Sequence, residues 1–148
     1  MFTSRSVKKK DYCCVGHNIT MDQSKFNIKT TAVIAAICAE KGMFLWKCYD
    51  KSVNVEKYQG YLITMLSLFK NKKLALFADN LKVHRNPGIR KYLEQMDVSM
   101  IYNAPYYPDG NPIETCFAKV KMHFKALKTQ EIVNNHHTNT RQLIEKAF

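Results

Sequence analysis

Apolar and polar positions repeat along the chain with two different periods, and the changes of period mark the predicted elements. Residues 1–30 are mixed and polar with no clean period, so we expect a loop there, with a short strand near Tyr12–Val15. Thr30–Cys38 and Met43–Tyr49 are rich in β-branched, apolar and aromatic residues. The turn residues Glu40–Gly42 between them predict an antiparallel hairpin, because Gly42 can adopt a positive φ.

The following segment changes to helical spacing. Val55–Phe69 places its apolar and aromatic residues on one face, which predicts an amphipathic helix. Leu74–Ala78 is a short all-apolar run, typical of a central strand in a covered sheet, and it ends abruptly at Asp79. The remaining predicted elements are a helix from Asn86–Pro87 to about Gln95, a strand at Val98–Tyr102, a helix from Asn111 onward and a final helix at Thr138–Phe148.

The helix after the Pro- and Gly-rich loop Ala104–Gly110 has the clearest start signal. Asn111 fits the N-cap, Pro112 the first helical position, and Glu114 the third position of a capping box. One face of this helix is expected to be buried, because its apolar residues recur every three or four positions. The alternation of strands and helices predicts an α/β fold in a chain of 148 residues, without internal repeats.

The charge balance changes the expected partner. The chain has 23 Lys and Arg against 12 Asp and Glu, a formal net charge of +11. Such an excess favours a polyanion, nucleic acid first, although a basic protein without such a ligand stays open. On the Glu114 helix, Lys121, Lys125 and Lys128 form a row suited to DNA phosphates. A solvated polar face is the alternative for that row.

The amino-terminal segment and the cysteines indicate the compartment. The start of the chain is polar and carries Lys8–Lys10, so we expect no secretory signal, and the longest apolar run, Ala32–Ala39, is too short to cross a bilayer. Five cysteines without a CxxC pair suit a reducing compartment. We therefore expect a nuclear or cytoplasmic protein that is neither secreted nor membrane-bound. Cys13, Cys14 and His17, with His136 and His137, match no common zinc finger.

Two acids carry the candidate chemistry. Asp79 lies at the carboxyl end of an apolar strand, where α/β sheets place their ligands, and Glu114 lies in the first turn of a later helix. Mg²⁺ prefers carboxylate oxygens, and two such ions can promote phosphoryl displacement. By themselves the two acids leave simpler interpretations open, since Asp79 could be a turn residue and Glu114 a helix cap.

Short motifs surround the two acids: Leu76–Asn80 is followed by His84, and the proline-rich segment Ala104–Gly110 leads into Asn111–Glu114. The first resembles the second-aspartate motif of the Tc/mariner superfamily of DDE transposases, and the second resembles that superfamily's proline-rich approach to its catalytic Glu. The 34 residues between the acids, positions 80–113, are a spacing that this superfamily uses. Tyr107 and Gly110 depart from the pattern, where the family usually has a small hydroxyl residue and an apolar residue.

This resemblance implies an RNase H-like mixed sheet flanked by helices, and cut-and-paste DNA transposition, meaning cleavage and strand transfer, with Mg²⁺ or Mn²⁺. Asp79 and Glu114 would be the second and third catalytic, metal-binding acids. His84 would orient a ligand or contact phosphate, with a structural histidine as the alternative. DNA, both transposon ends and target, would be the partner, with a homodimer in the transposition complex. The implied domain ranges are a remnant loop at 1–30, the catalytic domain at 30–130, and a linker and helix at 131–148.

The family's first acid is expected upstream of Met1, with Phe2–Ser6 following it, so the first central strand is expected to be missing. Asp11, Asp22 and Asp50 are poor substitutes, because none ends a suitably placed strand. We therefore expect the chain alone to be inactive in cutting DNA. Two other functions stay open. One is a transposon-derived fragment that binds DNA or a partner without catalysis, and the other is a different RNase H-like nuclease such as an RNase H or a resolvase.

Overall fold

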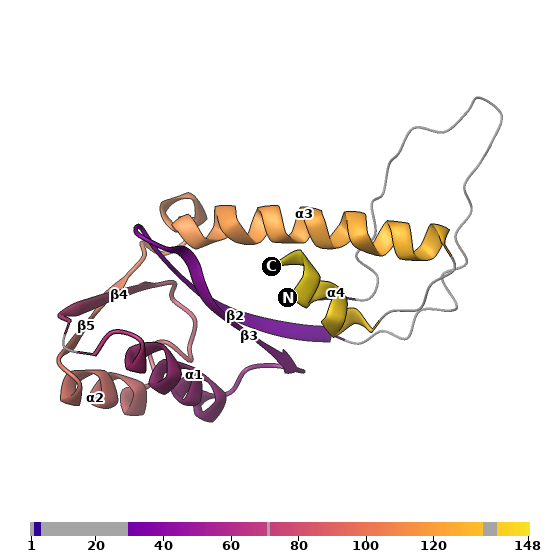
Figure 1. Ribbon diagram of the computed structural model, residues 1–148. Coiled ribbons are helices and arrows are strands. Elements are labelled where there is room, and N and C mark those ends of the chain that lie inside the picture. Colours follow the sequence, from indigo (N-terminus) through magenta and orange to yellow (C-terminus); the bar gives the residue numbers. More distant parts are fainter. Residues whose placement is uncertain (1, 4–29, 71, 135–138) are drawn as a thin grey trace. The chain divides into compact units, whose positions relative to one another are not determined.

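The computed structural model describes residues 2–3, 30–70, 72–134 and 139–148 (Figure 1). Several features noted in the sequence lie outside this part. They are the strand predicted near Tyr12–Val15, the lysines Lys8–Lys10, the acids Asp11 and Asp22, and the residues of Cys13–His17 and His136–His137. The chain divides into two compact units. The middle unit comprises Ile34–Lys47 and Ser52–Phe117, and the terminal unit comprises Met1–Val33, Cys48–Lys51 and Ala118–Phe148.

A β-hairpin and a capped helix open the described part of the chain. Strand β2 (Thr30–Cys38) leads into β3 (Gly42–Asp50), and Gly42 has a φ of 62°, which only glycine adopts without strain. Helix α1 (Val55–Ser67) starts at Asn54, whose side chain accepts a 3.0 Å hydrogen bond from the Lys57 amide. These elements confirm the predicted hairpin and the predicted helix.

Two parallel strands complete the sheet structure of the middle unit. β4 (Leu74–Ala78) and β5 (Val98–Tyr102) pair in register from one end to the other, Leu74 with Val98 and Ala78 with Tyr102. Helix α2 (Pro87–Gln95) connects them, and its N-cap Asn86 accepts a bond from the Gly88 amide. This is a βαβ unit, the arrangement that joins parallel strands.

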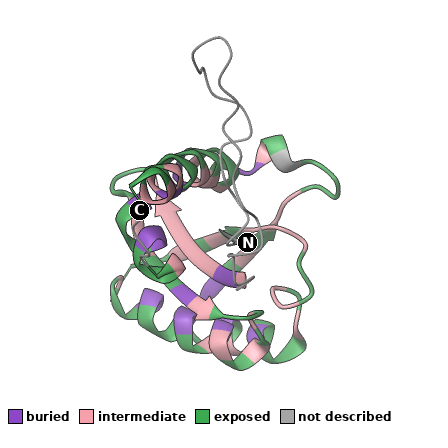
Figure 2. Ribbon diagram, turned by 90° about the vertical axis from the view of Figure 1, so that its right-hand side faces the viewer, coloured by how far each residue is buried: buried purple, intermediate pink, exposed green. Residues whose placement is uncertain are grey.

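The core of the middle unit lies on one side of β4 and β5, where α1 and α2 pack (Figure 1). The buried parts of these helices are purple in Figure 2. The core residues are Tyr58, Tyr61, Leu62, Met65, Leu66, Ile89, Leu93 and Val98.

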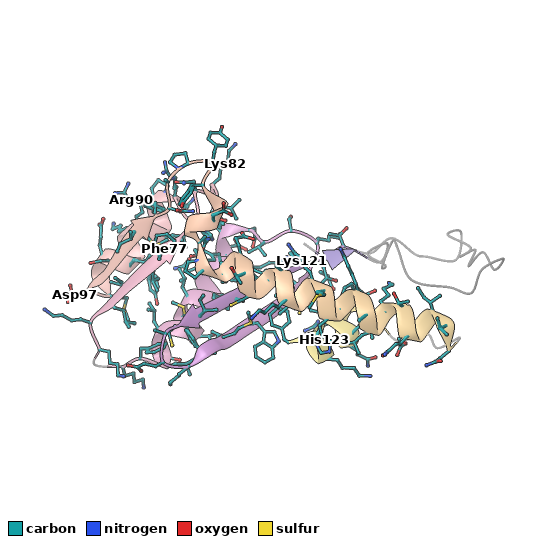
Figure 3. All side chains as sticks on the ribbon, turned by 90° about the horizontal axis from the view of Figure 1, so that it is seen from above. Phe77, Lys82, Arg90, Asp97, Lys121 and His123 are labelled. Atoms are coloured by element: carbon teal, nitrogen blue, oxygen red, sulfur yellow. The ribbon has the colours of Figure 1, made fainter. Side chains whose placement is uncertain are left out.

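The opposite face of β4 and β5 is exposed. Phe77 is 47% exposed and its register partner Ile101 is 52% exposed, whereas Leu74 and Leu76 pack against the core (Figure 3 labels Phe77). Successive side chains of a strand point to opposite faces, so this alternation corrects the prediction of a strand covered on both sides. Among the described residues of the middle unit, β4 is covered on one face only.

The terminal unit is built mainly from helices. Helix α3 (Pro112–Val133) begins in the middle unit and continues into the terminal unit, and α4 (Thr140–Ala147) follows it in sequence, with Asn139 as N-cap. Phe124 and Ile144 are completely buried in this unit. β1 (Phe2–Thr3) pairs antiparallel with β2, Phe2 opposite Thr31.

The described strands form two sheets, β1-β2-β3 and β4-β5, rather than one continuous mixed sheet. Within the described ranges no strand pairs both with β4 and with the hairpin, and the missing central strand stays a prediction. The domain ranges 1–30, 30–130 and 131–148 stay predictions, although α3 is continuous through residue 130. No helix among the described residues is long and apolar enough to cross a membrane.

Candidate metal centre

The carboxyl ends of β4 and β5 bring two polar residues to the same edge. Because Ala78 pairs with Tyr102, Asp79 and Asn103 are the first residues beyond the two strands. The Asn103 amide donates a 2.9 Å hydrogen bond to the Ala78 carbonyl, which extends the strand pairing up to the candidate site. Asp79 therefore starts from a fixed piece of backbone.

The Asp79 carboxylate is held in one orientation by its neighbours. Its Oδ1 accepts a 3.1 Å hydrogen bond from the Leu81 amide and lies 2.8 Å from His84 Nδ1. The Asp79 side chain is 39% exposed, whereas the His84 side chain is 16% exposed. The geometry thus presents an oriented carboxylate that solvent can reach.

His84 is itself fixed from two further directions. Its ring contacts the Tyr58 ring with 4.8 Å between the centroids, and its carbonyl accepts a 3.0 Å hydrogen bond from Tyr102 Oη. Burial raises the pKa of Tyr58, and the charges of Tyr102 and Asp79 act in the same direction. The Tyr58 hydroxyl is therefore neutral at pH values near 7, and it adds no negative charge beside Asp79.

A second set of contacts joins the loop after β4 to the end of β5. Asn80 Nδ2 donates a 2.7 Å hydrogen bond to the Asn103 carbonyl, and Arg85 Nη2 donates to Asn80 Oδ1. The Arg85 guanidinium also lies over the Tyr102 ring, 5.1 Å from its centroid. Lys82, labelled in Figure 3, is exposed in the same loop. No sequence pattern indicated Lys82, Arg85 or Asn103, although Asn103 follows a predicted strand just as Asp79 does.

Glu114 comes from the first turn of α3, as predicted. Its amide donates a 3.0 Å hydrogen bond to the carbonyl of Asn111, which is 8% exposed. The short 3₁₀ turn η2 (Pro108–Gly110) precedes the helix. A buried anchor at Asn111 thus fixes the point at which α3 starts, and Glu114 itself remains exposed.

One open hollow of about 250 Å³ contains both acids. It is lined by Asp79, Asn80, Leu81, Asn103, Ala104, Tyr106, Tyr107, Asn111 and Glu114. Carboxylate and amide oxygens are the ligands that hard divalent cations prefer, so this donor set fits Mg²⁺ or Mn²⁺. A larger hollow of about 450 Å³ is lined by residues of α2, of β5 and of the turn between them, which include Arg90 and Asp97, both labelled in Figure 3. Neither Asp79 nor Glu114 lines it.

Only two acids converge in the described part of the chain. No group of three His, Cys, Asp or Glu side chains there could hold a metal ion. Asp50 does not line the hollow of the two acids, and Asp11 and Asp22 lie outside the described residues.

The predicted lysine row on α3 is only partly exposed. Lys125 is exposed and Lys121 is half-buried, whereas Lys128 is 6% exposed. Lys128 lies one helical turn after the buried Phe124, so it shares the face that packs inward rather than a solvent-facing row. Burial accordingly lowers the pKa of Lys128. The structure removes Lys128 from the exposed row, and DNA contact by Lys121 and Lys125 stays a prediction.

Residues 1–134 match the family model described as DDE superfamily endonuclease. The chain belongs to the DDE superfamily endonuclease family. That result confirms the predicted family. Among curated protein sequences, none matches the chain.

Solved structures show the fold of this DDE family member. The Mos1 transposase paired-end complex with left transposon end has a TM-score of 0.57 at 22% identity, over 78% of this chain and 36% of that one. The Mos1 mariner paired end complex with Mn has a TM-score of 0.59 at 18% identity, over 95% of this chain and 47% of that one. The catalytic core domain of BIV integrase has a TM-score of 0.55 at 14% identity, over 80% of this chain and 76% of that one. The RNase H-like α/β fold is thereby confirmed, and the chain spans less than half of these Mos1 chains.

Proposed function

We propose that this chain supplies the catalytic core of a DNA transposase, in which Asp79 and Glu114 bind Mg²⁺ or Mn²⁺ for cleavage and strand transfer of DNA. The observation that carries the proposal is the shared hollow. Asp79 at the end of β4 and Glu114 at the start of α3 line the same open space, with 34 residues between them in the sequence (positions 80–113). Membership of the DDE superfamily endonuclease family supports the same chemistry.

The residues around the hollow have separate tasks in this proposal. Asp79 and Glu114 would hold the cations, which when bound polarise a phosphodiester and activate a hydroxyl nucleophile. His84 and the Leu81 amide keep the Asp79 carboxylate in place. Asn80 and Asn103 fix the two strand ends relative to each other.

Binding of Mn²⁺ tests the metal site without depending on turnover. Free Mn²⁺ has an electron paramagnetic resonance signal that decreases as the ion binds protein, so a titration gives the affinity. Asp79→Asn and Glu114→Gln should each remove most of the binding, because each substitution removes a charged ligand. Glu94→Gln and Asp97→Asn, in the larger hollow, are matched controls that should bind Mn²⁺ as the original chain does. Equal binding by all four variants would refute the metal site.

The net charge of +11 and the lysines of α3 support DNA as the partner. In this proposal the exposed Lys125 and the half-buried Lys121 contact phosphates, and the buried Lys128 does not. Removing one lysine that binds a phosphate should reduce the slope of log affinity against log salt concentration by about 1. Lys125→Ala should show this reduction, and Lys128→Ala should leave the slope unchanged.

A homodimer on DNA and a nuclear or cytoplasmic location are further parts of the proposal.

A second function is favoured by one observation, the convergence of only two acids in the described part of the chain. A domain that binds DNA without cutting it would need the basic surface but not the acids. In that case Asp79→Asn and Glu114→Gln would change neither Mn²⁺ binding nor the affinity for DNA. The Mn²⁺ titration therefore separates the two functions.

A further inference from the structure

Two tyrosines form one wall of the hollow that contains the acids. Tyr106 and Tyr107 lie in the loop between β5 and α3, and both line the hollow with Asp79 and Glu114. The Tyr106 side chain is fully exposed, at 104%, and Tyr107 is 56% exposed. Single exposed apolar residues are common, so exposure alone indicates nothing. What distinguishes this pair is its place beside the two candidate metal ligands.

The loop holds these tyrosines through specific contacts. Asn103 Nδ2 donates a hydrogen bond to the Tyr107 carbonyl, and Asn103 Oδ1 accepts one from the Ala104 amide. Tyr106 has a φ of 58°, a left-handed conformation that is strained for a bulky residue. Strain of this kind persists only where surrounding contacts impose it, and here it leaves the Tyr106 ring in solvent beside the hollow.

The position of the Tyr107 ring depends on a glycine. A Cβ atom at Gly110 would lie 2.6 Å from both Cδ1 and Cε1 of the Tyr107 ring, closer than any real side-chain contact. The ring can therefore occupy its place only because residue 110 is glycine. Tyr107 and Gly110 are the two positions at which the sequence departs from the Tc/mariner pattern. In the structure these two residues lie in contact with each other.

The chemistry of the wall and of the acids together selects a ligand. Carboxylates with bound cations suit a phosphate, and flat aromatic faces suit a nucleobase, on which they stack irrespective of its sequence. A hollow of about 250 Å³ lies at the small end of ligand pockets, so the part of the DNA inside it is about one nucleotide. We propose that Tyr106 and Tyr107 stack on one unpaired nucleobase of the DNA whose phosphate lies at Asp79 and Glu114. This inference rests on the proposed function.

Fluorescence anisotropy with two DNA probes tests the stacking directly. Both probes are duplexes with a short single-stranded 3′ tail, one with normal bases in the tail and the other with abasic sites, titrated with the full chain in Ca²⁺. A single base–aromatic stack is typically worth a factor of five or more in affinity. The variant with both Tyr106→Ala and Tyr107→Ala should bind the normal tail roughly tenfold more weakly and the abasic tail unchanged.

Conservative and coupled variants separate stacking from a general loss of structure. The variant with Tyr106→Phe and Tyr107→Phe retains both ring faces and should bind the normal tail as the original chain does. Gly110→Ala displaces the Tyr107 ring, so it should weaken binding of the normal tail in the original chain. In a Tyr107→Ala background the same Gly110→Ala change should have a clearly smaller effect, because the ring is already absent and only the contact with Asn103 Oδ1 at 3.0 Å remains.

The outcomes distinguish this inference from the function on which it rests. Equal loss on the normal and abasic tails, or unchanged binding by the double alanine variant, would overturn the stacking. If the cation dependence of DNA binding is at the same time abolished by Asp79→Asn and Glu114→Gln, the proposed function survives without it. If the original chain binds neither probe in Ca²⁺, the proposed function and the stacking are both refuted.

Discussion

At the scale of single residues, the proposed metal site depends on the orientation of Asp79. Its Oδ1 is occupied by the Leu81 amide and lies 2.8 Å from His84 Nδ1, so the carboxylate does not rotate freely. A ligand that is already oriented loses less conformational entropy when a cation binds. In the proposed site, His84 would thus contribute to the affinity for the cation without touching it.

We predict that His84→Ala lowers the affinity for Mn²⁺ about tenfold, the lower end of the range for partners that orient metal ligands. His84→Asn keeps an N–H donor close to the position of Nδ1 and should restore most of the affinity. The measurement is the Mn²⁺ titration. A histidine with a purely structural role, packing on Tyr58, would instead make both variants less stable while leaving the Mn²⁺ affinity unchanged.

Lys128 provides a prediction about pH. Burial lowers its pKa in the folded chain, whereas the unfolded chain has the ordinary value of about 10.4. Between these two values the unfolded state binds more protons, so this residue makes the free energy of unfolding rise as the pH increases. The contribution is lost as the pH falls through the folded-state pKa. Lys128→Met should remove this part of the alkaline rise.

Denaturant unfolding of the original chain and of Lys128→Met, at several pH values between neutral and about 10.4, measures the difference. Lys125→Met is the matched control, because Lys125 is exposed on the same helix. Parallel pH profiles for the original chain and Lys128→Met would contradict the prediction.

At the scale of elements, Asn103 connects β4, β5 and the loop before α3. Its amide bonds to Ala78, its carbonyl accepts from Asn80, and its side chain bonds to the backbone of Ala104 and Tyr107. We predict that Asn103→Ala destabilises the fold by about 1–2 kcal/mol, because it removes two side-chain hydrogen bonds. It should also speed hydrogen exchange at the Ala104 amide and weaken Mn²⁺ binding.

Asn54→Ala is the control for that prediction, because it removes the N-cap of α1 and should cost about 1 kcal/mol without touching the hollow. Thermal unfolding compares the stability of the two variants, and the Mn²⁺ titration compares their sites. If Asn54→Ala weakens Mn²⁺ binding as much as Asn103→Ala does, the effect comes from stability alone.

The elements also show what the sequence could and could not predict. Local signals were sufficient for β4, β5 and α2, because the apolar runs, Asn86 and Pro87 act within a few residues. The association of Asp79 with Glu114 followed from motifs. The role of Asn103 did not, since its hydrogen bonds depend on the register of two strands. Lys128 was misplaced because its spacing from Glu114 suited a row of lysines, while its packing depends on tertiary contacts.

At the scale of the whole molecule, the number of converging acids limits the chemistry. A pair of cations acting on one phosphodiester needs ligands on both sides, and the described part of the chain contributes Asp79 and Glu114 without a third. We predict that residues 1–148 alone bind DNA but do not nick supercoiled plasmid in Mg²⁺ or Mn²⁺. The assay compares the chain with Glu114→Gln, and Glu94→Gln serves as control. Nicking that Glu114→Gln abolishes would contradict this prediction and would point to Asp11 or Asp22, outside the described residues, as the third ligand.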